Sequence, residues 1–284
     1  MHLRGPMQSR NKREAKGFLA GCHGRVQWVD RLRGMTLCSM MLYHGMWDAV
    51  YLFGFSAPWY ERWPGALWQQ SICWTFLLLS GFSYPMGRSQ GRRGAEVFLA
   101  GILVSGVTAV WMPEAAVRFG VLTLIGSAML LWYYPHRLLE QRSQRCSMMG
   151  MWSGVCFSAL LFFLFREAAQ GYLGFSRLPG LRLPGLRLPE AWYRSGFSTY
   201  LGFPMPGFYS ADYFPLIPWI FLFSCGYFLS RIWECFGRPG RRYRDSKGHL
   251  FCFLGRHSLL IYLLHQPIIL FLFWIGDTGR RLIR

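Results

Sequence analysis

The chain has 284 residues, of which 52% are hydrophobic and 18% aromatic, and its formal net charge is +18. Only 15% of the residues are charged, which is too few to cover so apolar a core in water and excludes an ordinary soluble globule. The composition agrees instead with a polytopic membrane protein whose arginines lie in its loops.

Seven apolar segments are long enough to cross a bilayer. They cover residues 34–54, 67–87, 95–112, 117–134, 148–165, 214–230 and 250–275. Each must be a helix, because lipid offers the backbone no hydrogen-bond partner. The sequence therefore predicts an all-α fold, a polytopic transmembrane helical bundle of about seven spans.

Lysine and arginine predict the orientation. With the N-terminus in the cytoplasm, the cytoplasmic face carries 21 of the 31 basic residues, as the positive-inside rule requires. Residues 1–28 contain no apolar run of signal-peptide length and are predicted to be a basic cytoplasmic arm, either solvated or touching anionic lipid. No cysteine falls in an outer loop and no C-x-x-C occurs, so neither disulfides nor a cysteine zinc site is expected.

The one long connection, residues 166–213, is predicted to lie outside. It contains the repeat RLPGLRLPGLRLPE, whose regularly spaced prolines prevent a helix and predict an extended spacer without a function of its own. The stretch AWYRSGFSTYLGFPMPGFYSADYFPLIPW follows, and its rings are typical of an interfacial aromatic belt. The alternative is a stacking platform for a sugar ring or lipid headgroup, for which Trp192, Tyr209 and Tyr213 are the candidates.

Asp212 is the feature that a belt does not explain, because it sets an acid directly against the start of the sixth span. One interpretation is an N-cap, with Pro215 in the first helical turn. The other is a contact to a substrate that arrives from the outer side.

The first span contains an ionisable pair at depth. His44 lies eleven residues beyond Arg33, about 16 Å along a helix, and so near the middle of the bilayer when Arg33 is at the inner surface. Asp48 follows one turn later on the same face, where a carboxylate can orient an imidazole and stabilise its charged form. An intramembrane pair of this kind predicts a functional site.

The last span repeats the arrangement. His265 lies nine residues, about 13 Å, beyond Arg256, and Gln266 adds an amide beside it. A single histidine in a span is often only hydrogen-bonded to a neighbouring helix. Two histidines at matching depth, one with a paired acid, favour a site.

Group transfer across the bilayer fits these residues. Five arginines at the inner mouth could clamp the phosphates of a cytosolic cofactor: Arg31, Arg33, Arg92, Arg93 and Arg256. His44 could act as general base on an acceptor that Asp212 and the outer aromatic rings receive. His265 or Gln266 could stabilise charge that develops on a carbonyl oxygen.

Four stretches carry a family resemblance. DRLRGMTLCSMMLYHGMWD (30–48) resembles the opening of bacterial membrane proteins related to the heparan-alpha-glucosaminide N-acetyltransferase catalytic domain. FGVLTLIG (119–126), FYSADYFPLIPW (208–219) and LGRHSLLIYLLHQPII (254–269) match in order, so the resemblance covers nearly the whole chain beyond residue 25. The first element is also similar to the wider group of transmembrane acyltransferases that modify polysaccharides and lipids.

The resemblance implies an acyl donor, usually acetyl-CoA, used from the cytoplasmic side, and a glycan-like or lipid-linked acceptor on the other side. Carried onto matching positions, it points to Arg33 and His44, to Asp212, and to His265 with Gln266. The lysosomal members are thought to use a histidine in the first outer connection, and residues 55–66 contain none. This departure favours direct attack within a ternary complex over a covalent acetyl-histidine.

Three functions from different classes remain at this point. The first is a multi-pass acetyltransferase of the bacterial plasma membrane. Residues 29–284 form its domain within the lipid bilayer. The sequence does not decide between a monomer and a homodimer. The second is a small-solute transporter or channel lined by the same polar groups, although no inverted repeat supports it. The third is an electron carrier with His44 and His265 as axial haem ligands. For the first, no metal, no haem and no nucleic-acid partner is expected.

Overall fold

The computed structural model describes residues 26–141, 147–174, 185–237 and 250–283, with the side chains up to residue 275. Residues 1–25 of the predicted arm 1–28, much of the RLPGL repeat and most of the inner loop 231–248 lie outside the described residues. The prediction that these parts are solvated, extended or cytoplasmic therefore stays a prediction. The last two residues predicted for the arm, Gln27 and Trp28, already belong to the first helix.

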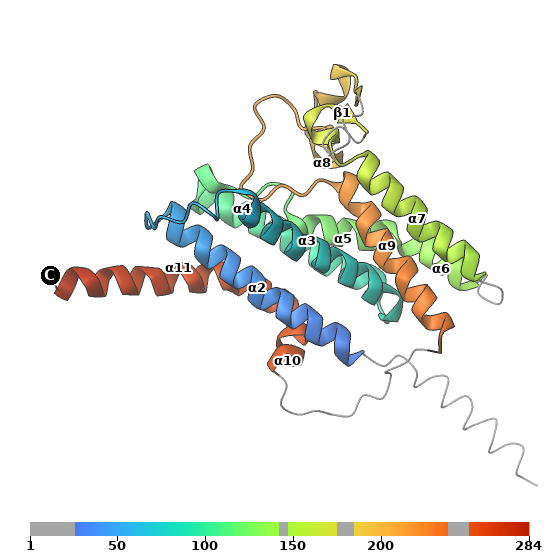
Figure 1. The fold of residues 1–284 in the computed structure, drawn as a ribbon, viewed down its shortest axis with the longest axis horizontal. Helices are drawn as coiled ribbons and strands as arrows, with labels where there is room; N and C mark the ends of the chain where they lie inside the picture. Colours follow the sequence, from blue (N-terminus) through green and yellow to red (C-terminus); the bar gives the residue numbers. More distant parts are fainter. Residues whose placement is uncertain (1–25, 142–146, 175–184, 238–249, 284) are drawn as a thin grey trace, which may run out of the picture.

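The described residues fold almost entirely into helices (Figure 1). The longer ones are α2 (Gln27–Tyr51), α3 (Trp63–Ser83), α4 (Gln90–Trp111), α5 (Val121–Leu131), α6 (Tyr133–Gln141), α7 (Met148–Leu164), α9 (Leu216–Cys235) and α11 (Ser258–Ile283). The shorter elements are η1 (Tyr84–Met86), η2 (Pro113–Ala115), η4 (Ala168–Gln170), η5 (Glu190–Tyr193), α8 (Gly196–Leu201), α10 (Leu250–Arg256) and the paired strands β1 (Tyr172–Leu173) and β2 (Leu186–Arg187).

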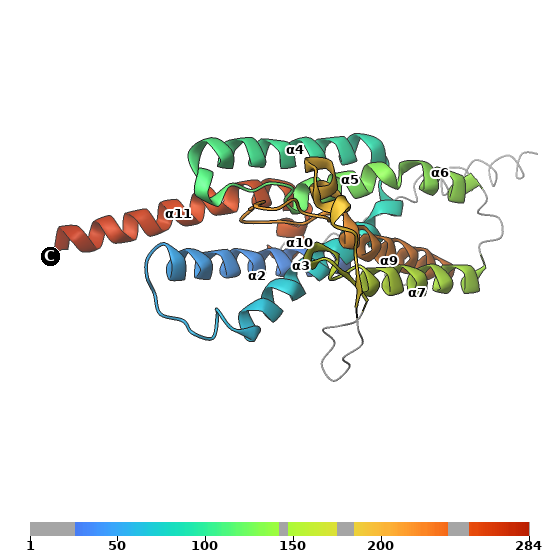
Figure 2. The same ribbon diagram turned by 90° about the horizontal axis from the view of Figure 1, so that it is seen from above.

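Every predicted span contains a helix. Within the described part of the chain, four segments are long and apolar enough to cross a membrane: α4, residues 148–170, α9 and residues 258–275. Helices α2 and α3 have 25 and 21 residues, which is also sufficient in length, but polar side chains interrupt their apolar character. Seen from two directions, α2 and α11 run the same way, as expected for the first and last spans (Figures 1 and 2). The all-α membrane architecture is confirmed.

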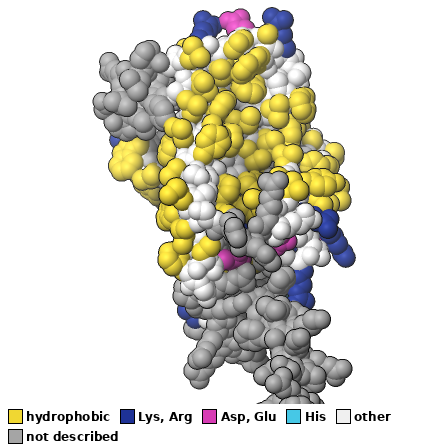
Figure 3. All heavy atoms as spheres, turned by 90° about the vertical axis from the view of Figure 1, so that its right-hand side faces the viewer, with side chains coloured by type: hydrophobic (Ala, Val, Ile, Leu, Met, Phe, Trp, Pro, Cys, Tyr) yellow, Lys and Arg dark blue, Asp and Glu magenta, His cyan; other side chains and the backbone are white. Residues whose placement is uncertain are grey.

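The surface of the bundle is that of a protein embedded in lipid. Figure 3 shows one side of the molecule with a continuous hydrophobic band and charged side chains above and below it. On α4 the large apolar side chains point outward: Leu99, Ile102, Leu103, Val107 and Val110 are all at least 42% exposed. Water would not tolerate so large an apolar surface on a monomer, whereas lipid does.

The fourth predicted span, 117–134, is wrong at its outer end. Helix α5 has only 11 residues, about 16 Å, and begins at Val121. Gly101 of α4 packs directly on Thr123 of α5. Since α4 continues to Trp111, α5 begins about 12 Å inward of the outer end of α4. Phe119, at φ 57°, turns the chain into the helix at this depth.

Two extended segments fill the space beyond α5. The backbone N–H groups of Ala211 and Phe214 donate to the carbonyls of Ala116 and Phe119, at 3.2 and 2.9 Å. The Ser210 hydroxyl accepts from the N–H of Arg118 at 2.8 Å. This pairing satisfies non-helical backbone at a depth where lipid could not.

The seventh predicted span is one continuous helix by its sequence pattern but two helices in the structure. His257 forms a turn between α10 and α11, and α10 packs against α2 rather than continuing the line of α11 (Figure 1). Pro267 lies inside α11 without ending it. The break follows Gly255 by two residues, and glycine is unfavourable inside a helix.

A reciprocal glycine contact joins α2 to α10. A Cβ at Gly34 would lie 2.0 Å from the carbonyl oxygen of Phe251, and one at Gly255 would lie 1.9 Å from the carbonyl oxygen of Asp30. Only glycine permits this approach, in which backbone C–H groups face carbonyl oxygens of the other helix. The contact fixes Arg33, next to Gly34, relative to Arg256, next to Gly255.

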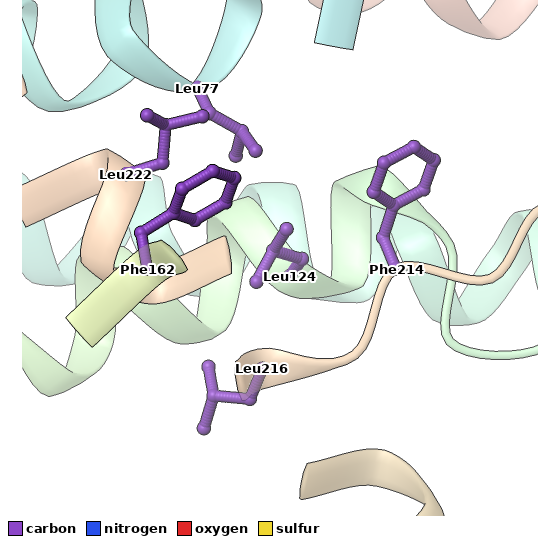
Figure 4. Packing of buried hydrophobic residues seen from close by; sticks show 6 residues of the cluster. All are labelled: Leu77, Leu124, Phe162, Phe214, Leu216 and Leu222. Carbon is purple, nitrogen blue, oxygen red and sulfur yellow. The ribbon is translucent and has the colours of Figure 1, made fainter. Parts of the chain in front are cut away.

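Helices α3 and α9 meet in the same way. A Cβ at Gly81 would lie 1.9 Å from the carbonyl oxygen of Phe223, and one at Gly226 would lie 2.1 Å from that of Leu78. The main apolar cluster lies beside this crossing and ties α3, α5, α7 and α9 together (Figure 4). It consists of Leu77, Leu124, Phe162, Phe214, Leu216 and Leu222.

Candidate functional site

A cavity of about 570 Å³ lies inside the bundle between α2, α3, α4, α5, α10 and α11. We call it the central cavity. Its polar lining includes Arg33, Tyr43, His44, Gln69, Cys73, Arg93, Asp212, Arg256, His257 and Tyr262. Because Arg33 and His44 both line it, the cavity extends about 16 Å along α2.

The end of the cavity that the predicted orientation places towards the cytoplasm is lined by three arginines and by two acids, Asp30 and Glu96. Of the five arginines predicted to bind a cofactor, Arg33, Arg93 and Arg256 line the cavity. Arg33 donates to the Ser83 hydroxyl at 2.6 Å and lies 3.7 Å from Asp30, so it is held in place by its neighbours.

The other two predicted arginines lie elsewhere. Arg31 is exposed and does not line the cavity. The side chain of Arg92 is 82% exposed and pairs with Glu96 at 2.8 Å. The structure therefore does not bring these two to the site, because α2 and α4 each present only one face to the cavity.

The break at His257 adds a helix N-terminus to the same end. Ser258, Leu259 and Leu260, the first residues of α11, line the cavity together with Arg256 and His257. The first N–H groups of a helix have no acceptor within it and carry the positive end of the helix dipole. The inner end of the central cavity thus combines arginines with backbone donors, an arrangement suited to phosphate groups.

His44 is the last residue of α2 that lines the cavity, and the ring of His265 lies against it. Their ring centroids are 5.0 Å apart with an angle of 56° between the planes. His44 lines the cavity and makes no hydrogen bond within the described residues. His265 lies behind it, 7% exposed, with its Nδ1 bonded to the carbonyl oxygen of Tyr262. The prediction that the two spans bring these histidines to one depth is confirmed.

The geometry does not suit the haem hypothesis. Axial ligands approach an iron from opposite faces of a flat macrocycle. Rings as close as those of His44 and His265 leave no space for such a plane between them.

Asp48 does not pair with His44, contrary to the prediction from the i+4 spacing. Asp48 is completely buried, and both of its carboxylate oxygens accept from the Gln266 amide, at 2.9 and 3.2 Å. The i+4 rule places two side chains on one face but does not decide which partner a third helix offers. Asp48 and Gln266 therefore join α2 to α11 immediately beside the two histidines.

Asp212 reaches the central cavity, although it does not cap α9. The N-cap of α9 is Pro215, without a side-chain hydrogen bond, so the N-cap interpretation is wrong. Instead the carboxylate accepts from the backbone N–H of Val121 at the start of α5. Its remaining accessible surface faces the cavity rather than bulk solvent. Burial raises the pKa of Asp212 to about 6, and the bond from Val121 opposes that shift.

This raised pKa predicts a pH-dependent stability. Between about pH 4 and 6 the folded protein keeps a proton on Asp212 that the unfolded chain releases, so stability falls as pH rises through that window. Asp212→Asn should remove the fall, making the variant relatively more stable at pH 7 by up to about 3 kcal/mol. Thermal unfolding in detergent at pH 4.5 and 7 measures this change in stability. The exposed Glu114→Gln is the control, and parallel curves for Asp212→Asn and the wild type would contradict the prediction.

The predicted acceptor-binding rings do not line the cavity. Trp192 packs on Phe203 with ring centroids 5.2 Å apart and is 46% exposed, and Tyr209 is 64% exposed. The Tyr213 hydroxyl donates to the carbonyl of Thr199 at 2.6 Å. These positions agree with an interfacial belt.

Five of the polar residues named above as lining the cavity are not predicted from the sequence: Tyr43, Gln69, Cys73, His257 and Tyr262. Tyr43, Cys73 and Tyr262 line the same cavity as Asp212. Tyr262 could have been found from its position three residues before His265, which puts it on the same helix face. Gln69 and Cys73 share a face of α3, but nothing in the sequence shows that this face meets α2.

Comparison with known proteins relates the chain to a family. The family model described as heparan-alpha-glucosaminide N-acetyltransferase, catalytic, matches residues 25–267. No curated protein and no solved structure matches the chain. The matched range contains every residue of the central cavity named above, from Arg33 to Tyr262. The chain therefore belongs to the heparan-alpha-glucosaminide N-acetyltransferase catalytic-domain family.

Proposed function

We propose that the protein is a transmembrane acetyltransferase that takes an acetyl group from cytosolic acetyl-CoA and transfers it to a glycan-like or lipid-linked acceptor on the outer side. Membership of the family supports a membrane acetyltransferase activity in general. The observation that carries the finer proposal is the central cavity, which joins the arginines at its inner end to His44 and Asp212.

At the inner end, Arg33, Arg93 and Arg256 would hold the phosphates of the donor. Guanidinium groups bind phosphate oxygens through paired, charge-assisted hydrogen bonds. The N-terminus of α11 would add backbone donors beside them. A donor anchored there would direct its acyl-bearing arm along α2 towards His44.

A pair of adjacent arginines tests the donor end. Arg93→Ala should weaken acetyl-CoA binding about tenfold to a hundredfold, because a charge-assisted phosphate contact is worth about 1.5–3 kcal/mol. Arg92→Ala removes the same charge one residue away, but from a side chain 82% exposed in solvent, and should leave affinity within about twofold. Calorimetry in detergent measures both. Equal losses in the two variants would attribute binding to overall charge and remove Arg93 from the site.

The transfer step needs a base at the acceptor. A hydroxyl or amine of the acceptor gives its proton to His44 and attacks the thioester carbonyl. The carbon–sulfur bond then breaks, and the proton on His44 passes to the departing thiolate, so that free CoA and the acetylated acceptor result. His44 supports this role because it faces the cavity with no hydrogen bond to a described residue.

The two hydrogen-bond donors expected to stabilise the carbonyl oxygen of the thioester are already bonded to other groups of the protein. The Nδ1 of His265 is bonded to the carbonyl of Tyr262, and the amide of Gln266 is bonded to Asp48. The hydroxyl of Tyr262 is the better candidate, since it lines the cavity and makes no hydrogen bond within the described residues. A hydrogen-bond donor that points at the developing oxyanion lowers the activation barrier most where water is excluded.

The acceptor would enter from the side of Asp212. This carboxylate lies at the cavity end nearest the extended outer segments and could hold an acceptor hydroxyl or ammonium. Direct attack from this position requires no covalent acetyl-enzyme.

Proteoliposomes test the proposal. Vesicles containing the protein in the inside-out orientation are given acetyl-labelled acetyl-CoA outside and a panel of amino sugars, oligosaccharides and lipid-linked sugars inside. Label on an internal acceptor, dependent on His44, is the expected result. Passage of an intact solute without labelled product would support the transporter hypothesis instead. Absence of acetyl-CoA binding would overturn the proposed donor.

A further inference from the structure

His265 has a fixed tautomer. Its Nδ1 is bonded to the backbone carbonyl of Tyr262, and a carbonyl oxygen can only accept. The Nδ1 therefore carries the proton, and in the neutral ring the Nε2 is an acceptor. This Nε2 is buried and has no hydrogen-bond partner among the described residues.

The nearest polar ring is that of His44. Its centroid is 5.0 Å from that of His265 and the planes are inclined at 56°. His44 has no hydrogen bond to a described residue, so neither of its ring nitrogens is committed. A buried acceptor without a donor thus lies beside a potential donor without an acceptor, and a rotation of one ring would join them.

Asp48 is bonded to Gln266 and not to His44. Its two carboxylate oxygens are bonded to the amide of Gln266, the residue directly after His265. That bond holds α11 against α2 at this level and so fixes the backbone from which His265 extends. The carboxylate thereby positions the second histidine and leaves the first without an acidic partner.

We propose that His265 is a positioning residue for His44. When the acceptor binds, one nitrogen of His44 faces the acceptor, and the N–H of the other donates to Nε2 of His265. This bond selects the tautomer of His44 that can accept a proton, and it stabilises the imidazolium that forms, as the carboxylate does in a hydrolase triad. The inference rests on the proposed transfer reaction, in which the proton returns from His44 to the thiolate, so that His265 ends each cycle unchanged.

Two substitutions at this position separate a positioning role from a structural one. In His265→Asn, the new amide would lie near the position of Nδ1 and keep the bond to the Tyr262 carbonyl, but no acceptor would stand at the position of Nε2. In His265→Gln, the longer side chain would bring its amide oxygen to that position and restore the acceptor. The positioning role therefore predicts a higher kcat for His265→Gln than for His265→Asn, whereas a structural role predicts the reverse.

The kinetic test measures kcat, the affinity for acetyl-CoA and the melting temperature of both variants. The expected kcat is at least about a hundredfold below wild type for His265→Asn and within about tenfold for His265→Gln, with donor affinity unchanged in both. A kcat of His265→Asn equal to or above that of His265→Gln would overturn the proposal.

A spectroscopic test does not depend on turnover. The wild-type protein labelled with ¹⁵N-histidine is compared with His265→Gln by NMR in micelles, which assigns the His265 nitrogens. A protonated Nδ1 and an unprotonated Nε2 are expected. A protonated Nε2 would overturn the positioning role even if the protein transfers acetyl groups. If the wild type transfers none, the transfer proposal fails, and without it this inference fails too, whatever the tautomer.

Discussion

Replacing His44 with alanine is expected to lower the rate of transfer by about 10²–10⁴-fold while acetyl-CoA binding and folding survive. The loss follows from removing the group that takes the acceptor proton. Folding should survive because His44 makes no hydrogen bond within the described residues, so its removal leaves no buried partner unpaired. Turnover, donor affinity and melting temperature measured together check this expectation.

Two further variants serve as controls for His44. Leu42→Ala removes a side chain that is 67% exposed on the same helix and should leave turnover unchanged. Asp48→Asn keeps one acceptor for Gln266 and should reduce the rate less than His44→Ala does. Full activity in folded His44→Ala protein would end the catalytic interpretation of this residue.

Gly34→Ala is expected to lower stability and to weaken donor binding together. The new Cβ would lie 2.0 Å from the carbonyl oxygen of Phe251, which is backbone and cannot move aside as a side chain would. Overpacking of this kind costs about 1–3 kcal/mol or more, and here it also forces α10 away from α2. Arg33 and Arg256 would then separate.

Gly45→Ala is the matched control, since it makes the same substitution on the same helix. Its Cβ would lie 4.0 Å from a methyl group of Ile269, an ordinary contact, and alanine favours the helix. Melting temperature and acetyl-CoA affinity should fall for Gly34→Ala and stay level or rise for Gly45→Ala. Similar values for the two variants would show that the α2–α10 contact is not required.

Much of the fold can be predicted because the bilayer restricts the choices. Apolar length and hydrogen bonding within the backbone make a helix the only option for each span, so all seven segments can be found. The inner boundary of α5 is also predicted closely. Its outer boundary is not, because residues 117–120 are kept extended by pairing with a distant segment, and the sequence does not show that pairing.

The sequence predicts several of the residues that form the site, but not which of them contact one another. Helical rise alone puts His44 and His265 at one depth. Which neighbour each polar group meets depends on how the helices rotate and cross, and a single sequence does not contain that information. Hence spacing pairs Asp48 with His44 where the structure pairs it with Gln266, and it assigns Asp212 to α9 where the structure assigns it to α5.

The short α5 also has a consequence for biosynthesis. Its first turn is completed by the segment around Ser210 and Asp212, and Ser210 bonds to Arg118 across 92 positions of the chain. A chain grows from its N-terminus, so the α4–α5 hairpin is made long before those partners leave the ribosome. Until then, unpaired N–H groups at the start of α5 cannot remain in hydrocarbon without a large cost. We therefore expect the hairpin to wait at the membrane surface or in the translocon, and to reach its final depth only after the segment around Ser210 has been made.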